Sequence, residues 1–361
     1  MVPAFAAPNF SSFPDAFHQP TYYKWNFQVA QQLASNMVLT VNYSGMHGIH
    51  IPVSDQGLNA YCAPAVCPGG FAGLPAAPPN AALGTVNQYL SAGVANYNGL
   101  SISLERRLTA GLSFNLNYTW SHSFDDVSNG GVSNEPFGIL VTDPSITTPQ
   151  NPFNIRSNYG PSDYDVRHYV SASLVYSDMF RHSGFHWGPN RIFGGWTLST
   201  NWFWRSGLPF TIVDSSASGA LVGQNYADTV FASPVTRLPG SCGAAVDTPC
   251  LTTSQFAPAS NGAPTGFGAM GRNSIYGPHF FDVDLALMKD VAITEHLSFS
   301  FGAQAYNLFN HTNFDQPVND ISNPQFGSTI GAVGPPTSLL GSFVGAGSSP
   351  RFLEIKGVLR F

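Results

Sequence analysis

The feature that most constrains this chain is an alternation of apolar and polar residues with a period of two. From Leu112 to Trp120, every second residue is large and apolar, and the residues between are Ser, Asn and Thr. Successive side chains of a strand point to opposite faces, so this pattern predicts strands with one apolar and one polar face. Nine segments show it: Lys24–Val29, Met37–Ser44, Leu100–Glu105, Leu112–Trp120, Val170–Ser177, Trp196–Trp204, Phe281–Met288, Leu297–Ala305 and Leu353–Phe361.

The low charge of the chain indicates that water is not its only solvent. Charged residues make up 9% of the sequence, whereas hydrophobic residues make up 43% and aromatic residues 13%; a soluble domain usually has about 25% charged residues. Membrane helices need roughly 18 consecutive apolar residues, and no such run occurs. Because a barrel is the β structure that satisfies every backbone group in lipid, we predict an all-β fold, an antiparallel transmembrane β-barrel of about nine or ten strands.

The connections between the predicted strands alternate between short and long. Four long ones, at 47–96, 122–164, 214–278 and 307–350, are separated by connections that are short or of middling length. Bacterial outer-membrane barrels have tight periplasmic turns and long extracellular loops. We therefore predict that residues 21–361 form part of an outer-membrane barrel with these four long loops outside the cell, and that residues 1–20 are the remnant of another extracellular loop.

Three features together predict a carboxy-terminal fragment. The strand count is odd, whereas bacterial single-chain barrels use even numbers. The predicted topology starts outside the cell, and Met1–Phe10 has neither a basic region nor an apolar core of an export signal. The alternative is a small independent barrel.

Two sets of residues are predicted to serve the membrane location. Aromatic residues near strand ends suit the lipid headgroup zone, and core packing in a soluble β-protein is the alternative for them. The last segment alternates and stops on an aromatic residue, as expected of a signal for the outer-membrane barrel assembly machinery. The aromatic set is Trp25, Tyr118, Trp120, Tyr176, Trp196, Trp202 and Trp204, and the assembly set is Leu353, Ile355, Leu359 and Phe361.

The four cysteines form two close pairs inside predicted loops. Cys62 lies near Cys67, and Cys242 lies near Cys250. In an oxidising periplasm such pairs form small disulfides. Zinc is the competing interpretation, but zinc sites prefer shorter Cys spacings and recruit nearby His.

Few residues of the sequence suggest a catalytic, metal-binding or nucleic-acid-binding site. Asp125 with Asp126, and Asp163 with Asp165, fit acid–base pairs or calcium ligands, but solvated charges at loop ends are commoner. His182 and His186 are four residues apart, but the intervening glycine argues against a metal-binding helix. A net charge of −6 with three lysines offers no basic stripe for nucleic acid. We predict no enzyme, no catalytic residue, no cofactor and no metal.

Several sequence motifs resemble those of the Oar-like TonB-dependent receptors in residue identity, order and spacing. The resemblance is strongest from about Tyr97 onward. Gln304 departs from it, because a glutamate is usual in that phrase. The matching phrases are Asp163–His168, Gly194–Trp196, Arg205–Phe210, Gly271–Pro278, Asp282–Leu285, Lys289–Asp290, Asn307–Phe314 and Arg351–Phe361.

The resemblance implies a receptor that takes up a scarce solute through a barrel of about 22 strands, energised by TonB through a plug that this chain lacks. The implied partners are outer-membrane lipid, the barrel assembly machinery, TonB and an unidentified solute. Two other classes stay open: a cell-surface binding or adhesion protein built as a sandwich or propeller, and a secreted carbohydrate-active protein.

Overall fold

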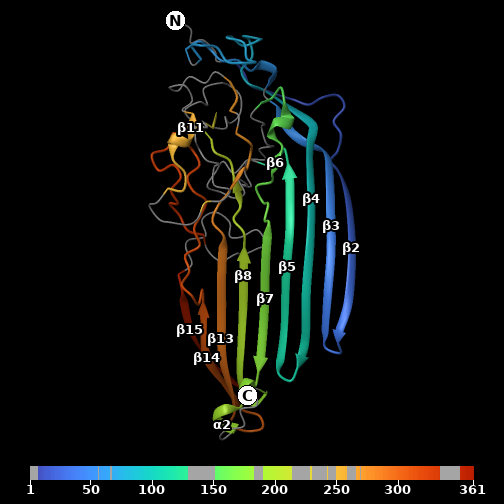
Figure 1. Ribbon diagram of the computed structural model, residues 1–361, viewed down its shortest axis with the longest axis vertical. Helices are drawn as coiled ribbons and strands as arrows, with labels where there is room; N and C mark the ends of the chain where they lie inside the picture. The colour runs from blue at the N-terminus through green and yellow to red at the C-terminus, as the bar shows by residue number, and fades with distance from the viewer. Residues whose placement is uncertain are drawn as a thin grey trace.

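The computed structural model describes residues 7–55, 57–65, 67–128, 151–182, 190–213, 228–229, 242, 249–257, 266–268, 270–333 and 350–361. Its main element is one antiparallel sheet in which nine long strands lie in chain order (Figure 1). Each predicted segment coincides with or overlaps one of them. They are β2 (Thr21–Ala34), β3 (Met37–Asp55), β4 (Val86–Thr109), β5 (Leu112–Asp125), β7 (His168–Ser177), β8 (Trp196–Arg205), β13 (Phe280–Ala292), β14 (Ser298–Tyr306) and β15 (Phe352–Arg360).

The strand register sorts the alternating residues onto two faces. Across six strands from β3 to β13, one row of paired residues is polar except for one phenylalanine, and the next row along the strands is apolar. We call these the polar face and the apolar face. The polar row is Thr40, Ser103, Asn117, Ser171, Phe203 and Asp282; the apolar row is Val41, Ile102, Tyr118, Val170, Trp204 and Phe281.

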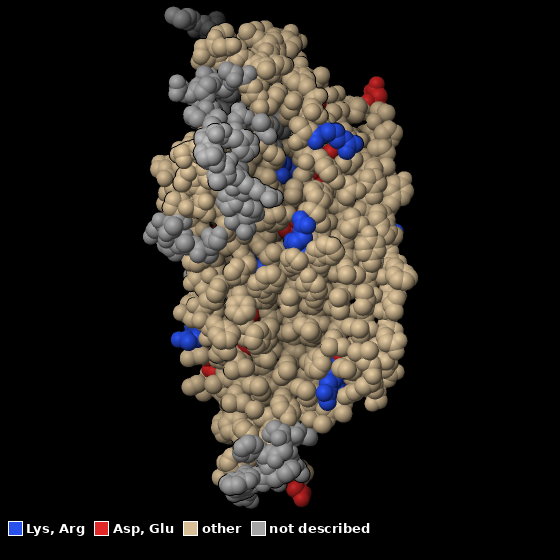
Figure 2. Space-filling view, viewed as in Figure 1, with Lys and Arg blue, Asp and Glu red and all other residues tan. Residues whose placement is uncertain are grey.

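The apolar face exposes large side chains. Ile355 is 90% exposed, Phe27 69% and Trp120 52%. Soluble proteins rarely expose a continuous apolar surface of this kind, whereas a barrel places such a band against lipid. The side of the molecule seen in Figure 2 carries only scattered charged side chains. By strand parity, the seven aromatic residues predicted for the headgroup zone all belong to the apolar face: Trp25, Tyr118, Trp120, Tyr176, Trp196, Trp202 and Trp204.

The two ends of the sheet differ in the length of their connections. The short connections and the carboxy terminus lie at one end, and the long connections lie at the other (Figure 1). The turn from β4 to β5 is tight because Ala110 and Gly111 adopt φ of 50° and 78°, as a two-residue hairpin of the favoured twist requires. At the same end, the connection from β7 to β8 contains two single-turn helices, α1 (Met179–His182) and α2 (Asn190–Phe193).

Two strands extend further than the sequence predicted. β3 continues to Asp55 and β4 begins at Val86, so both enter the interval 47–96 that we expected to be loop. The pairing there is interrupted by register shifts between Gly48 and Pro52. A shift in register moves side chains to the opposite face, so the period of two is lost although the strands stay paired.

The long connections pack around a small apolar core of their own. Phe210, Ile212, Leu251, Phe256 and Ile275 in this core are each at most 2% exposed. Short strands hold it: β9 (Pro209–Phe210) pairs with β12 (Ile275–Tyr276), and β10 (Asp228–Thr229) pairs with β11 (Phe256–Ala257). Part of the interval 214–278, predicted as loop, is therefore folded. Two further short strands, β1 (Phe10–Ser12) and β6 (Gly160–Pro161), join the main sheet at the same end.

The sheet is open. Within the described residues, β2 and β15 each pair with a neighbour on one side only. None of the described helices is both long and apolar enough to cross a membrane.

Arginine placed on the two faces of β4 should have different effects. Ile102→Arg on the apolar face should lower the free energy of unfolding in lipid by about 2–4 kcal/mol, because it puts a charge against hydrocarbon. Ser103→Arg on the polar face is the matched control, and its cost should stay below about 1 kcal/mol. Denaturant unfolding in lipid vesicles measures both, and equal losses would contradict the assignment of the faces.

Candidate functional site

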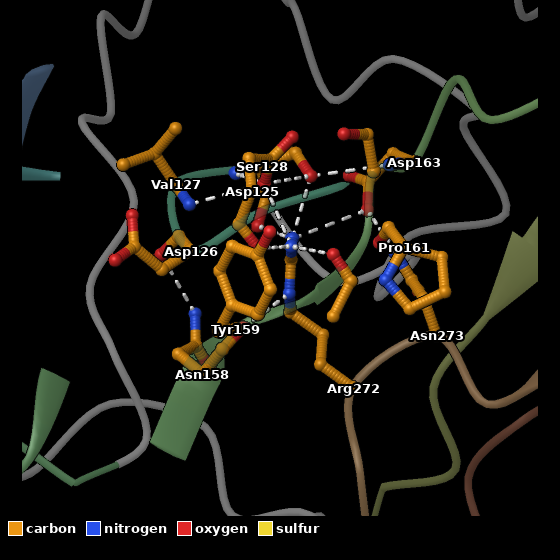
Figure 3. Close-up of polar contacts among 12 residues, drawn as sticks. Asp125, Asp126, Val127, Ser128, Asn158, Tyr159, Pro161, Asp163, Arg272 and Asn273 are labelled. Carbon is orange, nitrogen blue, oxygen red and sulfur yellow. Dashed lines mark hydrogen bonds and ion pairs between the residues drawn. The ribbon is translucent and has the colours of Figure 1, made fainter. Parts of the chain in front are cut away.

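A buried polar network connects three segments at the end of the sheet that carries the long connections (Figure 3). The first is the end of β5 with the residues up to Ser128. The second runs from the 3-10 helix η2 (Ile155–Asn158) through β6 to Asp165, and the third leads from Met270 into β12. Segments more than 100 residues apart in the sequence therefore meet in one cluster.

Arg272 lies at the centre of the network and is 1% exposed. Its guanidinium donates to the Asp125 carboxylate at 2.6 Å and to the backbone oxygens of Ser128 at 2.6 Å, Asn158 at 2.8 Å and Gly160 at 3.2 Å. It also donates to the Ser128 hydroxyl and the Asp125 backbone oxygen. A charge taken out of water is costly unless its hydrogen bonds are replaced, and here all three guanidinium nitrogens have acceptors.

The two neighbouring carboxylates at the end of β5 differ in their partners. Asp125 pairs with Arg272 and also accepts from the backbone N–H and the hydroxyl of Ser128, both at 2.8 Å. Asp126 accepts from the backbone N–H of Val94 at 2.7 Å, and Arg156 is 3.9 Å away on the exposed side. Burial raises the pKa of Asp126, because desolvation disfavours the charged form.

Asn273, the next residue after Arg272, continues the network toward the small apolar core. Its φ of 52° is left-handed, a conformation that asparagine tolerates better than most residues. Its side-chain amide donates to the Asp163 carboxylate at 2.6 Å and to the backbone oxygen of Pro161 at 2.8 Å. Its backbone N–H donates to the Thr211 hydroxyl at 2.9 Å.

A second carboxylate hub lies around Asp165. The carboxylate accepts from the backbone N–H of Ser123 at 2.7 Å and from the Tyr276 hydroxyl at 2.8 Å, and His122 Nδ1 is 3.0 Å away. Burial, together with the charge of Asp165, raises the pKa of Tyr276 to about 12. Tyr276 therefore stays protonated and acts as a donor.

These contacts correct our prediction for the aspartates. We expected solvated charges at loop ends, but Asp125, Asp126, Asp163 and Asp165 are all at most 8% exposed. They are buried because Arg272, Asn273 and backbone N–H groups replace water as their partners. One signal was present in the sequence: Arg272 is the only lysine or arginine between Arg237 and Lys289, and an arginine in a folded apolar region is rarely buried unless it is paired.

The arrangement suits a structural lock between loops. Each of its carboxylates already has at least one oxygen engaged by a donor, and a catalytic acid–base pair would need contact with a substrate. Among the described residues, no group of three or more His, Cys, Asp or Glu is arranged to hold a metal ion. His186 lies outside the described residues, so the spacing of His182 and His186 is not described.

The other predicted residues are found at three places. Cys62–Cys67 and Cys242–Cys250 are disulfides, both at the end with the long connections. Leu353, Ile355 and Leu359 lie on the apolar face of β15, and Phe361 follows that strand.

The polar face contains a cavity of about 310 Å³ near its centre. The sequence did not reveal this cavity, because its residues are far apart in the chain and most are ordinary polar residues of a strand. Four adjacent strands line it: β5 through Asn115 and Asn117, β7 through Ser171, Ala172 and Ser173, β8 through Asn201, Trp202 and Phe203, and β13 through Asp282 and Asp284.

The family follows from the sequence as a whole. Residues 1–339 match the family model described as "Outer membrane beta barrel domain". The chain belongs to this family. As an outer membrane β-barrel domain, it is located in the bacterial outer membrane. A search of curated protein sequences gave no match to it.

Solved structures similar to this barrel domain are outer-membrane transporters and receptors. The outer membrane transporter YddB from Escherichia coli aligns over 98% of the chain at 10% identity with a TM-score of 0.48. The FrpB iron transporter from Neisseria meningitidis aligns over 97% at 10% identity with a TM-score of 0.41. A ferric enterobactin receptor, PfeA, from Pseudomonas aeruginosa aligns over 94% at 12% identity with a TM-score of 0.41. The alignments cover 34%, 32% and 31% of those chains, so this chain spans about a third of their length.

Removing the central arginine of the barrel domain should loosen the long connections. Arg272→Met should destabilise the protein by about 3–5 kcal/mol, because it leaves Asp125 buried without its counter-ion. Arg156→Met is the matched control: its side chain is 65% exposed and 3.9 Å from Asp126, so its cost should be at most about 1 kcal/mol. The two variants are compared by thermal unfolding in detergent and by the rate of proteolysis within 155–165. If Arg272→Met matched Arg156→Met in both assays, the network would not be holding the loops.

Proposed function

We propose that this chain is the carboxy-terminal barrel portion of a TonB-dependent receptor that takes up a scarce solute. The observation that carries the proposal is the contact between Arg272 and the segment up to Asp165. Two of the phrases that resemble such receptors, Asp163–His168 and Gly271–Pro278, meet in the same buried network. The resemblance therefore concerns motifs whose residues contact one another in the structure, and not only separate stretches of sequence.

The sheet supports a membrane role over the two alternative classes. A soluble adhesion protein or a secreted carbohydrate-active protein would cover the large apolar residues that this sheet exposes, such as Phe27 and Ile355. We do not propose an enzymatic activity, because the network's carboxylates are engaged by donors and belong to a structural arrangement.

The orientation follows from the two ends of the sheet. We place the short connections in the periplasm and the long ones outside the cell, since outer-membrane barrels are built this way. Residues 1–20 then lie on the outside, where β1 pairs with the outer end of β4. The seven aromatic residues predicted for the headgroup zone, which all lie on the apolar face, then serve as headgroup anchors.

The open sheet supports a larger barrel. In hydrocarbon, the unpaired N–H and C=O groups of β2 and β15 need partners. We propose that further strands of the whole receptor supply them, and that a plug domain couples the barrel to TonB. Lipid, the assembly machinery, TonB and the solute are then its partners.

Contact with TonB tests the proposed function. The gene product that carries residues 1–361 should crosslink to TonB in intact host cells and be captured with it by an antibody against the long connections. An unrelated porin from the same membranes is the control and should show no such product. If the gene product and the porin behaved alike, the receptor proposal would fail, and the assignment to the barrel family would stand.

The carboxy terminus tests the proposed assembly signal. Phe361→Asp should reduce the amount of inserted protein several-fold, because the final strand carries the alternating residues and the terminal aromatic that the machinery would read. Phe153→Asp is the control: its side chain is 58% exposed and lies in a long connection. Insertion is measured by heat-modifiable gel migration of outer-membrane fractions, and equal insertion of the two variants would refute the signal.

A further inference from the structure

The cavity on the polar face has hydrogen-bonding groups available for a ligand. Within the described residues, the Asn201 side chain has no hydrogen-bond partner, and the Asp282 carboxylate has only the backbone N–H of its neighbour Val283. Ser171 and Ser173 add two hydroxyls, and Asn117 donates to Asn115 at 2.5 Å, which fixes the amides on that side. Amides, hydroxyls and carboxylates on adjacent strands provide both donors and acceptors over a short distance.

An aromatic wall borders one side of the cavity. The Phe203 ring packs edge to face with Tyr169 at 5.1 Å and with Phe280 at 5.5 Å between ring centroids. The register places all three rings on the polar face, in two adjacent rows. Aromatic rings on a surface that otherwise faces water provide a flat apolar patch next to the polar groups.

The charge of the cavity is acidic. The two rows of paired residues that line it run through Ser171 and Ser173. They include Asp282, Asp284 and Glu105 and, within the described residues, no lysine or arginine. The nearest arginine on this face is Arg205, which is 6% exposed and lies over the Phe280 ring at 5.6 Å. An anionic ligand would meet like charge without a cation to offset it.

We propose that this cavity binds a neutral, polyhydroxylated solute through one sugar-like ring. Hydroxyls on the ring bond to Asn201, Asp282 and the serines, while its C–H face packs on Phe203. The volume of about 310 Å³ is at the lower end of ligand pockets, which span about 300–1,000 Å³, and fits one such unit. The inference rests on the proposed function, because only in a receptor would the polar face border the path of a solute.

A matched pair of sugars tests the proposal. Lactose is neutral, and lactobionate keeps the galactose ring but carries one carboxylate. Binding of each radiolabelled sugar to the full chain, folded in detergent micelles, is measured by equilibrium dialysis. We expect lactose to bind at least about tenfold more tightly than lactobionate. The double variant Asp282→Asn with Asp284→Asn should close that gap, because it removes the repulsion and keeps hydrogen-bonding groups.

A second pair of variants tests the location. Asn201→Leu should weaken lactose binding about tenfold, as the loss of one to two hydrogen bonds predicts. Thr40→Val, in the same sheet face but outside the cavity, should leave it unchanged, and heat-modifiable migration verifies that both variants are folded. No lactose binding, equal binding of the two sugars, or an unaffected Asn201→Leu variant would each overturn the proposal. None of these results would alter crosslinking to TonB, so the two failures are distinguishable.

Discussion

The rest of the structure depends on the lack of hydrogen-bonding partners for the backbone in hydrocarbon. An unpaired peptide group there costs several kcal/mol, so the strands must stay in register over their whole membrane-spanning length. Continuous register brings one face of every strand to lipid and the other to water. The rows through Val41 and Thr40 are the direct result, since each keeps its chemical character over six strands with Phe203 as the one exception.

Beyond the membrane this constraint is relaxed, and a different interaction takes over. Where the structure describes the long connections, their regular pairing is limited to short strands such as β9 and β12, so many of their polar groups need partners from side chains. Arg272 supplies several of these at once, because its planar guanidinium reaches Asp125 and the backbone of both neighbouring segments. A lysine would offer one point charge in place of a fork of donors. The small core around Phe210 and Leu251 then packs on segments whose course is already fixed.

The sequence predicted those parts of the fold in which contact with lipid or water alone determines the order of apolar and polar residues. Nine strands, the disulfide pairs and the alternation of short and long connections followed from period, spacing and length. The outer parts of β3 and β4 were missed because the register shifts near Gly48 break the period. The aspartates were assigned to solvent because the burial of Asp125 depends on Arg272, a partner 147 residues away. The residues next to Asp125 in the sequence do not show that the two side chains meet. The cavity was missed for the same reason: Asn201 and Asp284 become neighbours only through strand pairing.

The length of β4 has a consequence for how the molecule meets its surroundings. The strand has 24 residues, whereas about 9–11 tilted residues cross the hydrocarbon layer. More than half of β4 therefore exceeds the span of the hydrocarbon layer, and its pairing with the end of β3 continues there through the register shifts near Gly48. One side of the mouth is stiff because backbone pairing continues through it, and the other side consists of irregular segments locked around one arginine. In the proposed receptor, the paired strands β3 and β4 would form the rigid side of the entrance, and side-chain contacts such as those of Arg272 would hold the opposite side.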